Sequence, residues 1–305
     1  MIKMAIERLA WCEISKKALE HNVSEIKKFI GPKVKLMAVV KGNAYGHGAI
    51  DVSKIAMDSG ADYLGVSSFY EAKRLREAGI KAPIVILGFT PTENYYDMVE
   101  NGITVTIRSL DVARSLVTAA RRKDKIAKVW IKVDTGMHRL GLNPGEVLFF
   151  IKKLQDLPNL EIEGIFTHFA DSDNLDLDFT KKQIHVFKKL LKELESENIS
   201  IPIKSVANTS AVFSLPESHF DLVRVGLGIY GYDESKRKTA VKPVLTFKTE
   251  IVQITEIEKG ETVGYGRTFE AKRPTQVATI AVGYGDGFRR APKNWSEVLI
   301  NGQRA

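Results

Sequence analysis

The chain has 305 residues but only one cysteine, Cys12. No intramolecular disulfide can form, and such a composition is typical of proteins in a reducing cytosol. No segment approaches the roughly 20 apolar residues that a membrane helix needs. The first eleven residues include Glu7 and lack the long apolar core of a signal peptide. The sequence therefore predicts a cytoplasmic protein without a membrane partner.

Acidic residues are outnumbered by basic ones, with 37 Asp and Glu against 45 Lys and Arg, a net charge of +8. A nucleic-acid-binding surface would gather its cations on one face, with aromatic residues between them. Here the basic residues come as scattered pairs, such as Lys27-Lys28 and Lys188-Lys189, on polar helix faces beside acidic residues. This pattern indicates solvated helix surfaces and predicts no nucleic-acid partner.

Short apolar segments alternate with longer amphipathic ones over most of the chain. Eight segments have the Val and Ile content of strands covered on both faces: Leu36–Val40, Tyr63–Val66, Ile84–Leu87, Ile103–Ile107, Val129–Val133, Ile162–Phe166, Lys204–Ala207 and Leu222–Val225. The helical patterns are Ser15–Ile30, Val52–Ser59, Phe69–Ala78, Leu110–Arg121, Pro144–Leu154 and Phe179–Glu197.

This alternation predicts an α/β fold, a (β/α)8 TIM barrel over residues 1–235. A doubly wound open sheet is the alternative, but no Gly-x-Gly-x-x-Gly turn follows the first strand.

The pattern changes after Tyr232. A polar connector leads into apolar residues that alternate as in strands, with turns at 258–260 and 272–274. Asn301-Gly302 is typical of a hairpin turn after the strand-like Glu297–Ile300, and the chain ends three residues later. We therefore expect a small β domain over residues 236–305 that is incomplete in this chain.

Polar residues cluster where the predicted barrel strands end, which is where barrel enzymes place their functional groups. These residues are Lys41, Lys132, Asp134, Thr167, His168, Asn208, Thr209 and Arg224, with Arg139 in a loop and Gly226 after the last strand. Because they follow five different strands at corresponding ends, we expect them to form a single site.

Lys41 directly follows the first barrel strand. At the mouth of a barrel a partly desolvated lysine has a nucleophilic amine, whereas the alternative is a lysine that extends from a strand end into water. Gly42, Gly46 and Gly48 favour the first interpretation, because glycine lets the backbone approach a ligand closely.

The segment Ala38-Val39-Val40-Lys41-Gly42-Asn43-Ala44-Tyr45-Gly46-His47-Gly48 resembles the cofactor-lysine signature of the alanine racemase family, which usually has Ala in place of Gly42. Similar segments follow in the family's order: Lys132-Val133-Asp134-Thr135-Gly136-Met137-His138-Arg139-Leu140-Gly141, Thr167-His168-Phe169-Ala170, Arg224-Val225-Gly226-Leu227, Gly264-Tyr265-Gly266 and Val282-Gly283-Tyr284-Gly285-Asp286-Gly287. The resemblance covers essentially the whole chain and implies a pyridoxal 5′-phosphate (PLP) binding barrel with a C-terminal β domain. Family members continue further, so it also implies a C-terminal truncation.

The resemblance implies a set of cofactor-binding residues: Lys41, Tyr45, His168, Asn208, Thr209, Arg224, Gly226 and Leu227. Lys41 would bind PLP covalently, and Arg224 would face the pyridine nitrogen. A guanidinium stays protonated, so that nitrogen would stay unprotonated and the cofactor would be a weaker electron sink. Barrels commonly bind phosphate in the loops that carry Thr209 and Gly226. The alternatives are a helix N-cap for Thr209 and a rim salt bridge for Arg224.

Racemisation takes a proton from one face of Cα and returns one to the other, which suits two bases. The resemblance implies Lys41 on one face and Tyr265 of a partner subunit on the other, and hence a homodimer. His168 and Arg224 resemble the hydrogen-bonded chain that assists this tyrosine. An ordinary strand tyrosine is the alternative for Tyr265.

Three further residues resemble those that contact the substrate. Arg139 is similar to the arginine that orients its carboxylate, for which a fork of donors is apt. Lys132 is similar to a lysine that is carbamylated in some relatives and holds that arginine, which an unmodified lysine would repel. Tyr284, with Tyr45, resembles residues that crowd the site and favour a small side chain.

A metal site at His168, Asp171 and Asp173 was the remaining possibility for this region. No second histidine lies at ligand spacing, so we expect no metal, and expect the acids to cap the following helix. The predicted function is that of an isomerase, a PLP-dependent alanine racemase supplying D-alanine for cell-wall peptidoglycan. A racemase for serine or another amino acid, and a PLP-binding protein without turnover, stay open as alternatives.

Overall fold

The computed structural model describes residues 8–235, 239–289 and 297–304. Residue contacts divide the chain into two units. We call Ser15–Val244 the barrel unit, and Met1–Ile14 together with Leu245–Ala305 the β unit.

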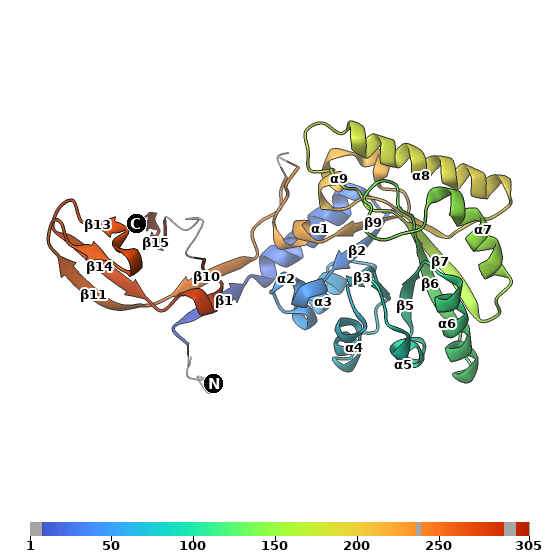
Figure 1. Ribbon diagram of the computed structural model, residues 1–305, viewed down its shortest axis with the longest axis horizontal. Coiled ribbons are helices and arrows are strands. Elements are labelled where there is room, and N and C mark those ends of the chain that lie inside the picture. Colours follow the sequence, from blue (N-terminus) through green and yellow to red (C-terminus); the bar gives the residue numbers. More distant parts are fainter. Residues whose placement is uncertain (1–7, 236–238, 290–296, 305) are drawn as a thin grey trace. The chain divides into compact units, whose positions relative to one another are not determined.

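The barrel unit contains the eight parallel strands that the apolar segments predict (Figure 1). They are β2 (Lys35–Val39), β3 (Tyr63–Val66), β4 (Ile84–Ile86), β5 (Ile103–Ile107), β6 (Ala127–Lys132), β7 (Leu160–Phe166), β8 (Ile203–Ser205) and β9 (Leu222–Val225). Their order is β8-β7-β6-β5-β4-β3-β2-β9. Backbone hydrogen bonds from Asp221 N to Lys204 O (3.1 Å) and from Arg224 N to Ala207 O (3.0 Å) join β9 to the β8 side and close the barrel.

The helices lie around the outside of the strands (Figure 1). They are α1 (Lys16–Ile30), α2 (Lys41–Tyr45), α3 (Ala49–Asp58), α4 (Phe69–Glu77), α5 (Tyr95–Glu100), α6 (Leu110–Arg122), α7 (Pro144–Gln155), α8 (Asp178–Ser196) and α9 (Thr209–Ser214). Ser15, Ser68 and Ser109 cap the N-termini of α1, α4 and α6 by accepting a backbone N–H. All six expected helices form, whereas α2, α5 and α9 were too short to give a periodic pattern.

Large side chains from the strands fill the barrel interior. The cluster consists of Met37, Tyr63, Val85, Trp130, Phe166, Ile203 and Leu222, with Leu87 against it. One buried carboxylate lies among them. Glu163 accepts hydrogen bonds from Trp130 Nε1 (2.8 Å) and Thr104 Oγ1 (3.3 Å), and Lys128 Nζ lies 3.3 Å from it. Side chains therefore fill the interior of the barrel. A site can form from the polar residues that follow the strands.

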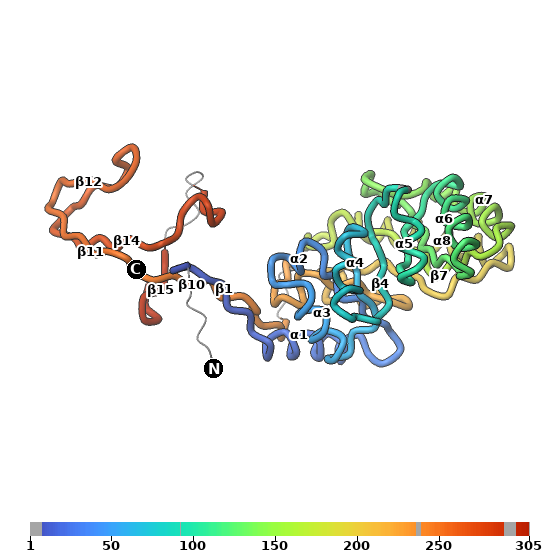
Figure 2. Tube along the Cα trace, turned by 90° about the horizontal axis from the view of Figure 1, so that it is seen from below, coloured from blue at the N-terminus to red at the C-terminus, as the bar shows by residue number. Residues whose placement is uncertain are grey.

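The β unit consists of two-stranded antiparallel pairs. The pairs are β1 (Ala10–Ile14) with β10 (Leu245–Thr249), β11 (Ile251–Ile257) with β14 (Thr275–Ile280), β12 (Thr262–Val263) with β13 (Phe269–Glu270), and β15 (Leu299–Ile300) with β16 (Gln303–Arg304). Figure 2 shows the blue β1 running beside the orange β10.

This pairing differs from the division at residue 235 that the sequence predicts. β1 precedes the barrel in the chain but belongs to the β unit, because its partner is β10. The connector up to Val244 belongs to the barrel unit, since Val244 N donates to Tyr230 O (3.1 Å) and Val244 O accepts from Ser15 N (2.9 Å). A pairing between segments so far apart leaves no local signal.

The hairpin turn forms as predicted at the end of the chain. Asn301 and Gly302 have φ of 51° and 80°, the left-handed conformation of a type I′ turn. Its second strand is short, because the two residues Gln303 and Arg304 pair with β15.

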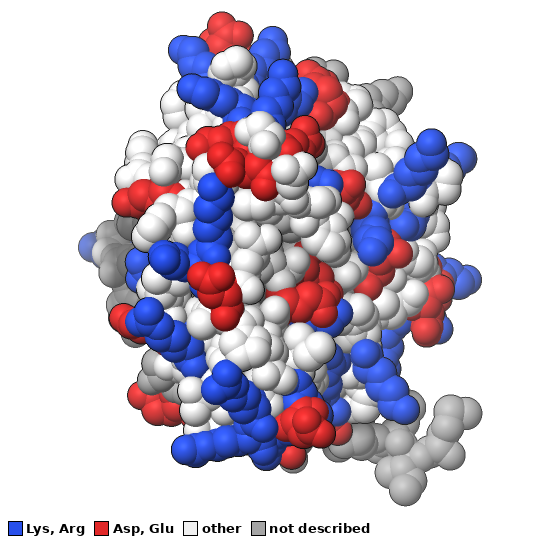
Figure 3. Space-filling model, turned by 90° about the vertical axis from the view of Figure 1, so that its right-hand side faces the viewer, with Lys and Arg blue, Asp and Glu red and all other residues white. Residues whose placement is uncertain are grey.

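Charged residues of both signs lie side by side on the face shown in Figure 3. Two ion pairs of the barrel unit show the same mixing of charges, since Lys152 Nζ of α7 lies 2.7 Å from Glu197 Oε2 and Lys181 Nζ of α8 lies 3.9 Å from Asp178 Oδ1. Cations interspersed with acids in this way make no continuous basic surface. Among the described residues, no helix is both long enough and apolar enough to cross a membrane.

Candidate active site

The carboxyl ends of the barrel strands enclose a cavity of about 350 Å³. It is lined by ten of the twelve residues to which the family resemblance assigns a role: Lys41, Tyr45, Lys132, Arg139, His168, Asn208, Thr209, Arg224, Gly226 and Leu227. The other two of the twelve, Tyr265 and Tyr284, belong to the β unit, where they are 78% and 64% exposed.

Lys41 begins α2, which is not an ordinary helix. Gly42, Asn43, Ala44 and Tyr45 all have positive φ, between 52° and 62°, so the chain makes a left-handed turn. The left-handed conformation costs a residue with a Cβ about 1 kcal/mol, and here three such residues adopt it in succession. Lys41 is an exposed residue at the mouth of the barrel, where it lines the cavity.

Arg224 is buried at the end of β9, with only 4% of its surface exposed. Its Nη1 donates to Ser205 Oγ (2.6 Å), and its Nη2 donates to the carbonyls of Thr167 (2.7 Å) and Val206 (3.2 Å). Burial lowers the pKa of Arg224 to about 9, so the guanidinium keeps its charge at neutral pH. These partners are neutral oxygens, so Arg224 makes no rim salt bridge with any of the described residues, and its charge is available to a ligand.

His168 is the fourth partner of that guanidinium, with its Nδ1 3.2 Å from Arg224 Nη2. An arginine only donates, so Nδ1 accepts and the neutral imidazole carries its proton on Nε2. Burial, reinforced by the charge of Arg224 and other cations, holds the pKa of His168 well below 6.5. His168 is therefore a neutral donor through Nε2.

Thr209 and the chain after β9 form a cradle of small polar groups. Thr209 Oγ1 accepts from the N–H groups of Gly226 (3.2 Å) and Gly228 (3.3 Å). A Cβ on residue 226 would come within 2.9 Å of Tyr45 Oη, so glycine lets the Tyr45 hydroxyl lie close to the backbone here. Burial raises the pKa of Tyr45, which keeps its hydroxyl a donor. Such a set of hydroxyls and backbone N–H groups suits a phosphate.

The N-cap of α9 is Asn208, not Thr209, because Asn208 Oδ1 accepts from Ala211 N (3.1 Å). The same oxygen accepts from Ser172 Oγ (2.8 Å). The alternative interpretation of Thr209 as the cap was therefore wrong, and its hydroxyl serves the cradle.

Lys132 is the buried lysine of the site. It is 7% exposed, and its Nζ lies 5.5 Å from the centre of the Phe166 ring. Burial, with the neighbouring charges of Arg139 and Arg224, lowers its pKa to about 8. A buried cation among other cations is unfavourable, so this position suits a group that brings negative charge. Arg139 itself is exposed on its loop.

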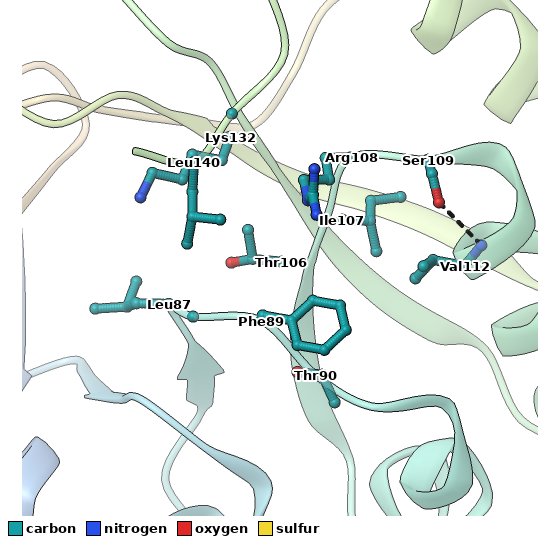
Figure 4. Close-up of a pocket in the computed structure, with 12 residues that line it drawn as sticks. Leu87, Phe89, Thr90, Thr106, Ile107, Arg108, Ser109, Val112, Lys132 and Leu140 are labelled. Atoms are coloured by element: carbon teal, nitrogen blue, oxygen red, sulfur yellow. Dashed lines mark hydrogen bonds between the residues drawn. The ribbon is translucent and has the colours of Figure 1, made fainter. Parts of the chain in front are cut away.

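Behind Lys132 lies a smaller side pocket of about 170 Å³. Leu87, Lys132 and Leu140 line both this pocket and the main cavity. Figure 4 shows Leu87, Thr106 and Leu140 around the side pocket, with Phe89 below them. The side pocket and the main cavity therefore share part of their walls next to Lys132.

Asp134 shapes the loop that carries Arg139. Its Oδ1 accepts from the N–H groups of Gly136 (2.9 Å), Met137 (3.0 Å) and His138 (3.1 Å). Burial acts to raise the pKa of Asp134, but these backbone donors outweigh it and lower the pKa. Asp134 is therefore an ionised loop organiser.

Of the acids between His168 and α8, Asp176 and not Asp171 or Asp173 accepts a backbone N–H at the start of the helix. Asp176 Oδ1 accepts from Asp178 N (2.9 Å) at the start of α8, so the prediction that Asp171 or Asp173 caps this helix was wrong. Within residues 8–235, 239–289 and 297–304, no group of three or more His, Cys, Asp or Glu residues could hold a metal ion.

Sequence reasoning missed several residues that contact the site. Ser205 holds Arg224, and Gln183 Nε2 of α8 donates to His168 O (3.1 Å). Ser67 follows β3 and lines the cavity. Because Ser67 stands at a strand end, the same rule that singled out Lys41 would have found it, whereas Gln183 lies within a helical pattern and gives no signal.

Two family models match the chain: "Alanine racemase, N-terminal domain" at residues 14–234 and "Alanine racemase, C-terminal domain" at residues 244–305. The alanine racemase of Methanococcus maripaludis is 42% identical over 299 residues, with 96% of this chain and 80% of that protein aligned. Alanine racemase 1 of Oceanobacillus iheyensis is 40% identical, covering 99% of this chain and 81% of that protein.

Solved structures are similar too. The alanine racemase of Clostridium difficile 630 has a TM-score of 0.92 at 34% identity, covering 98% of this chain and 79% of that one. The Bacillus anthracis alanine racemase with bound L-Ala-P has a TM-score of 0.89 at 34% identity, covering 98% and 78%. The likeness thus extends over both units of the chain.

Proposed function

The chain belongs to the alanine racemase family, and we propose that it interconverts L-alanine and D-alanine with bound PLP. One observation carries the proposal: a single cavity holds the amine of Lys41, the buried guanidinium of Arg224 and the open cradle at Thr209 and Gly226. The D-isomer would supply cell-wall peptidoglycan.

The residues of the cavity fit PLP. The hydroxyls of Tyr45 and Thr209 and the backbone N–H of Leu227 would supply donors for the phosphate beside Gly226, and Lys41 would supply the amine for covalent attachment. We assign Arg224 to the pyridine nitrogen, which would remain unprotonated against a group that only donates. When bound, PLP supplies the electron sink that makes the Cα proton of an amino acid removable.

Two bases exchange protons at Cα. We assign the Lys41 amine to one face and the Tyr265 phenol, contributed by a partner subunit, to the other. His168 has its proton on Nε2, so it can donate to the tyrosine oxygen and stabilise the anionic form that acts as a base. Arg224 fixes this tautomer by occupying Nδ1.

The substrate carboxylate is assigned to Arg139, whose guanidinium offers paired donors. Lys132, with its lowered pKa of about 8, is the residue that would hold Arg139 after carbamylation, since the added carboxylate replaces repulsion by attraction. Tyr45 and Tyr284 would restrict the side chain to a small group. Serine is the second candidate substrate, and competition between alanine and serine in kcat/KM tests it.

A homodimer follows from assigning Tyr265 to the partner's site. The β unit supports this proposal, because Ile251, Val252, Ile254 and Phe269 are 44–60% exposed, more apolar surface than a solvated strand needs. Sedimentation of the protein measures its subunit number. The exposed free thiol of Cys12 supports a reducing cytoplasmic location.

The test is to incubate the protein with PLP and L-alanine and to follow D-alanine by chiral chromatography. Borohydride reduction and peptide mapping should place a pyridoxyl adduct on Lys41. An adduct on Lys41 without D-alanine would favour the PLP-binding protein without turnover. L-alanine that stays pure at high protein concentration, with no adduct on Lys41, would remove the proposal altogether.

A further inference from the structure

The left-handed turn after Lys41 needs something to hold it. Asn43, Ala44 and Tyr45 each carry a Cβ that disfavours positive φ, and strained backbone persists only where its surroundings enforce it. Part of the support is local, since Asn43 Oδ1 accepts from Ala49 N (3.0 Å). The first peptide of the turn, Gly42, is held from elsewhere.

Glu71 of α4 makes that contact. Its Oε1 accepts from Gly42 N at 2.6 Å, and its Oε2 accepts from Ser67 N (2.7 Å) and Ser67 Oγ (2.8 Å). One carboxylate therefore joins the turn after β2 to the loop after β3. Charge-assisted bonds of this length are among the stronger hydrogen bonds in proteins.

The position of Glu71 gives a second reason to regard this contact as specific. Ser68 caps α4 and Glu71 stands three residues later, the spacing of a capping box, in which the glutamate would accept from the backbone N–H of Ser68. Here the Glu71 carboxylate instead accepts from Ser67 and from Gly42, in a neighbouring loop. The Glu71 carboxylate thus contacts the turn beside Lys41 in place of the capping-box contact at the start of α4.

We propose that Glu71 is a positioning residue for Lys41, holding the strained turn that sets the direction of its side chain. The inference rests on the proposed function only in taking Lys41 as the reactive amine. A carboxylate is required because both groups that it faces, Gly42 N–H and Ser67 N–H, are donors. A glutamine of the same shape has one accepting oxygen, so its amide NH₂ would face a donor.

The variants to compare are Glu71→Gln, Ser67→Ala and Glu77→Gln. Glu77 is the matched control, an exposed glutamate at the other end of α4. Ser67→Ala removes only the hydroxyl bond and keeps both backbone bonds to Glu71. The readouts are amide hydrogen exchange over residues 42–46, the yield of pyridoxyl adduct on Lys41 at limiting PLP, and kcat and KM for alanine.

We expect Glu71→Gln to accelerate exchange over residues 42–46 by about tenfold or more, to lower the adduct yield, and to lower kcat by roughly 10- to 100-fold with little change in KM. Glu77→Gln should match the wild type, and Ser67→Ala should accelerate exchange over residues 42–46 less than Glu71→Gln does, because both backbone bonds to Glu71 remain. A strained turn is also relieved by glycine, so adding Ala44→Gly to Glu71→Gln should recover part of the lost adduct yield.

If Glu71 acted only at the start of α4, Ala44→Gly would not restore the adduct yield of Glu71→Gln. Failure of Ala44→Gly to restore any of that yield would therefore count against the proposal. An active wild type with an indistinguishable Glu71→Gln variant would overturn it. If Glu71→Gln does not fold, Glu71→Asp is the second variant, since its shorter carboxylate cannot reach both loops and should show the same acceleration and loss. A wild type that forms no adduct on Lys41 would overturn the proposed function instead, which separates the two outcomes.

Discussion

Arg224 Nη2 and His168 Nδ1 lie 3.2 Å apart, a distance at which the guanidinium must donate and the imidazole must accept. The contact fixes which ring nitrogen carries the proton. It also adds a positive charge beside an already buried imidazole. The two residues come from different strand ends, so the barrel brings together a hydrogen-bond donor, His168, and the group that sets its tautomer, Arg224.

We first predict that His168 stays neutral, with its proton on Nε2, at neutral pH and at pH 6.5, because burial and Arg224 hold its pKa well below 6.5. NMR of ¹⁵N-histidine-labelled protein measures both the tautomer and the titration, with His168→Asn to assign the signal. A titration midpoint near 6.5, or a proton on Nδ1, would contradict the geometry.

A second prediction concerns Arg224→Lys. An ammonium cannot reproduce the planar fork that holds Ser205, two carbonyls and His168, so the imidazole loses its fixed tautomer. We expect kcat for alanine to fall by roughly 10²- to 10³-fold, with more pyruvate from transamination. Ser205→Ala is the control, since it removes one contact and leaves His168 held, and should cost less than about tenfold. Equal losses in both variants would argue against tautomer control.

The cradle is tested by Gly226→Ala. A Cβ there would meet Tyr45 Oη at 2.9 Å, so either the tyrosine moves or the space for a phosphate closes. We expect PLP affinity to fall by about 10- to 100-fold with little loss of stability, measured by fluorescence titration and thermal unfolding. Gly145→Ala is the matched control, because a Cβ at Gly145 meets nothing within 4 Å and its φ is not positive. Equal PLP affinity in both variants would place the phosphate elsewhere.

The buried lysine makes a prediction about stability. Below pH 8 Lys132 is protonated in both folded and unfolded chains, and the folded state bears the cost of burying the charge. Between the folded pKa of about 8 and the unfolded value of 10.5, the unfolded chain binds more protons, so the free energy of unfolding rises with pH. In bicarbonate-free buffer, Lys132→Met should therefore be more stable than wild type at pH 7 by about 1–2 kcal/mol.

That advantage should shrink towards pH 10, which urea unfolding at both pH values measures. Lys189→Met, at an exposed position of α8, is the control and should show no such pH-dependent difference. An advantage of the same size at pH 7 and pH 10 would mean that packing, and not charge burial, is responsible.

The barrel could be predicted because its signals are local. Each strand is a short run such as Ile103–Ile107, and each helix has a periodic apolar face such as that of Lys16–Ile30. The site followed from the same pattern, since residues at strand ends must share one rim. The roles of Tyr265 and Tyr284 rest on resemblance alone and stay predictions.

What the sequence did not reveal depends on contacts between distant segments. The partner of Glu71 lies 29 positions away, at Gly42, and glutamate three residues after a serine predicts only a helix cap. The left-handed turn could not be read from Asn43-Ala44-Tyr45, because two of these residues rarely adopt positive φ. Lys132, not Lys41, is the buried amine, a difference set by the direction of the side chains.

The pairing of β1 with β10 has a consequence for how the protein is made. Ala10–Ile14 leaves the ribosome first, and its partner Leu245–Thr249 follows only after the whole barrel. At ~5–20 residues per second, the ~230 residues between them take ~10–50 s to synthesise. The barrel, whose ends Ser15 and Val244 are hydrogen-bonded to each other, can fold in that interval. The β unit, which we propose carries Tyr265 to the partner's site, is completed only after the barrel. The barrel of a nascent chain can therefore fold before two chains form a dimer.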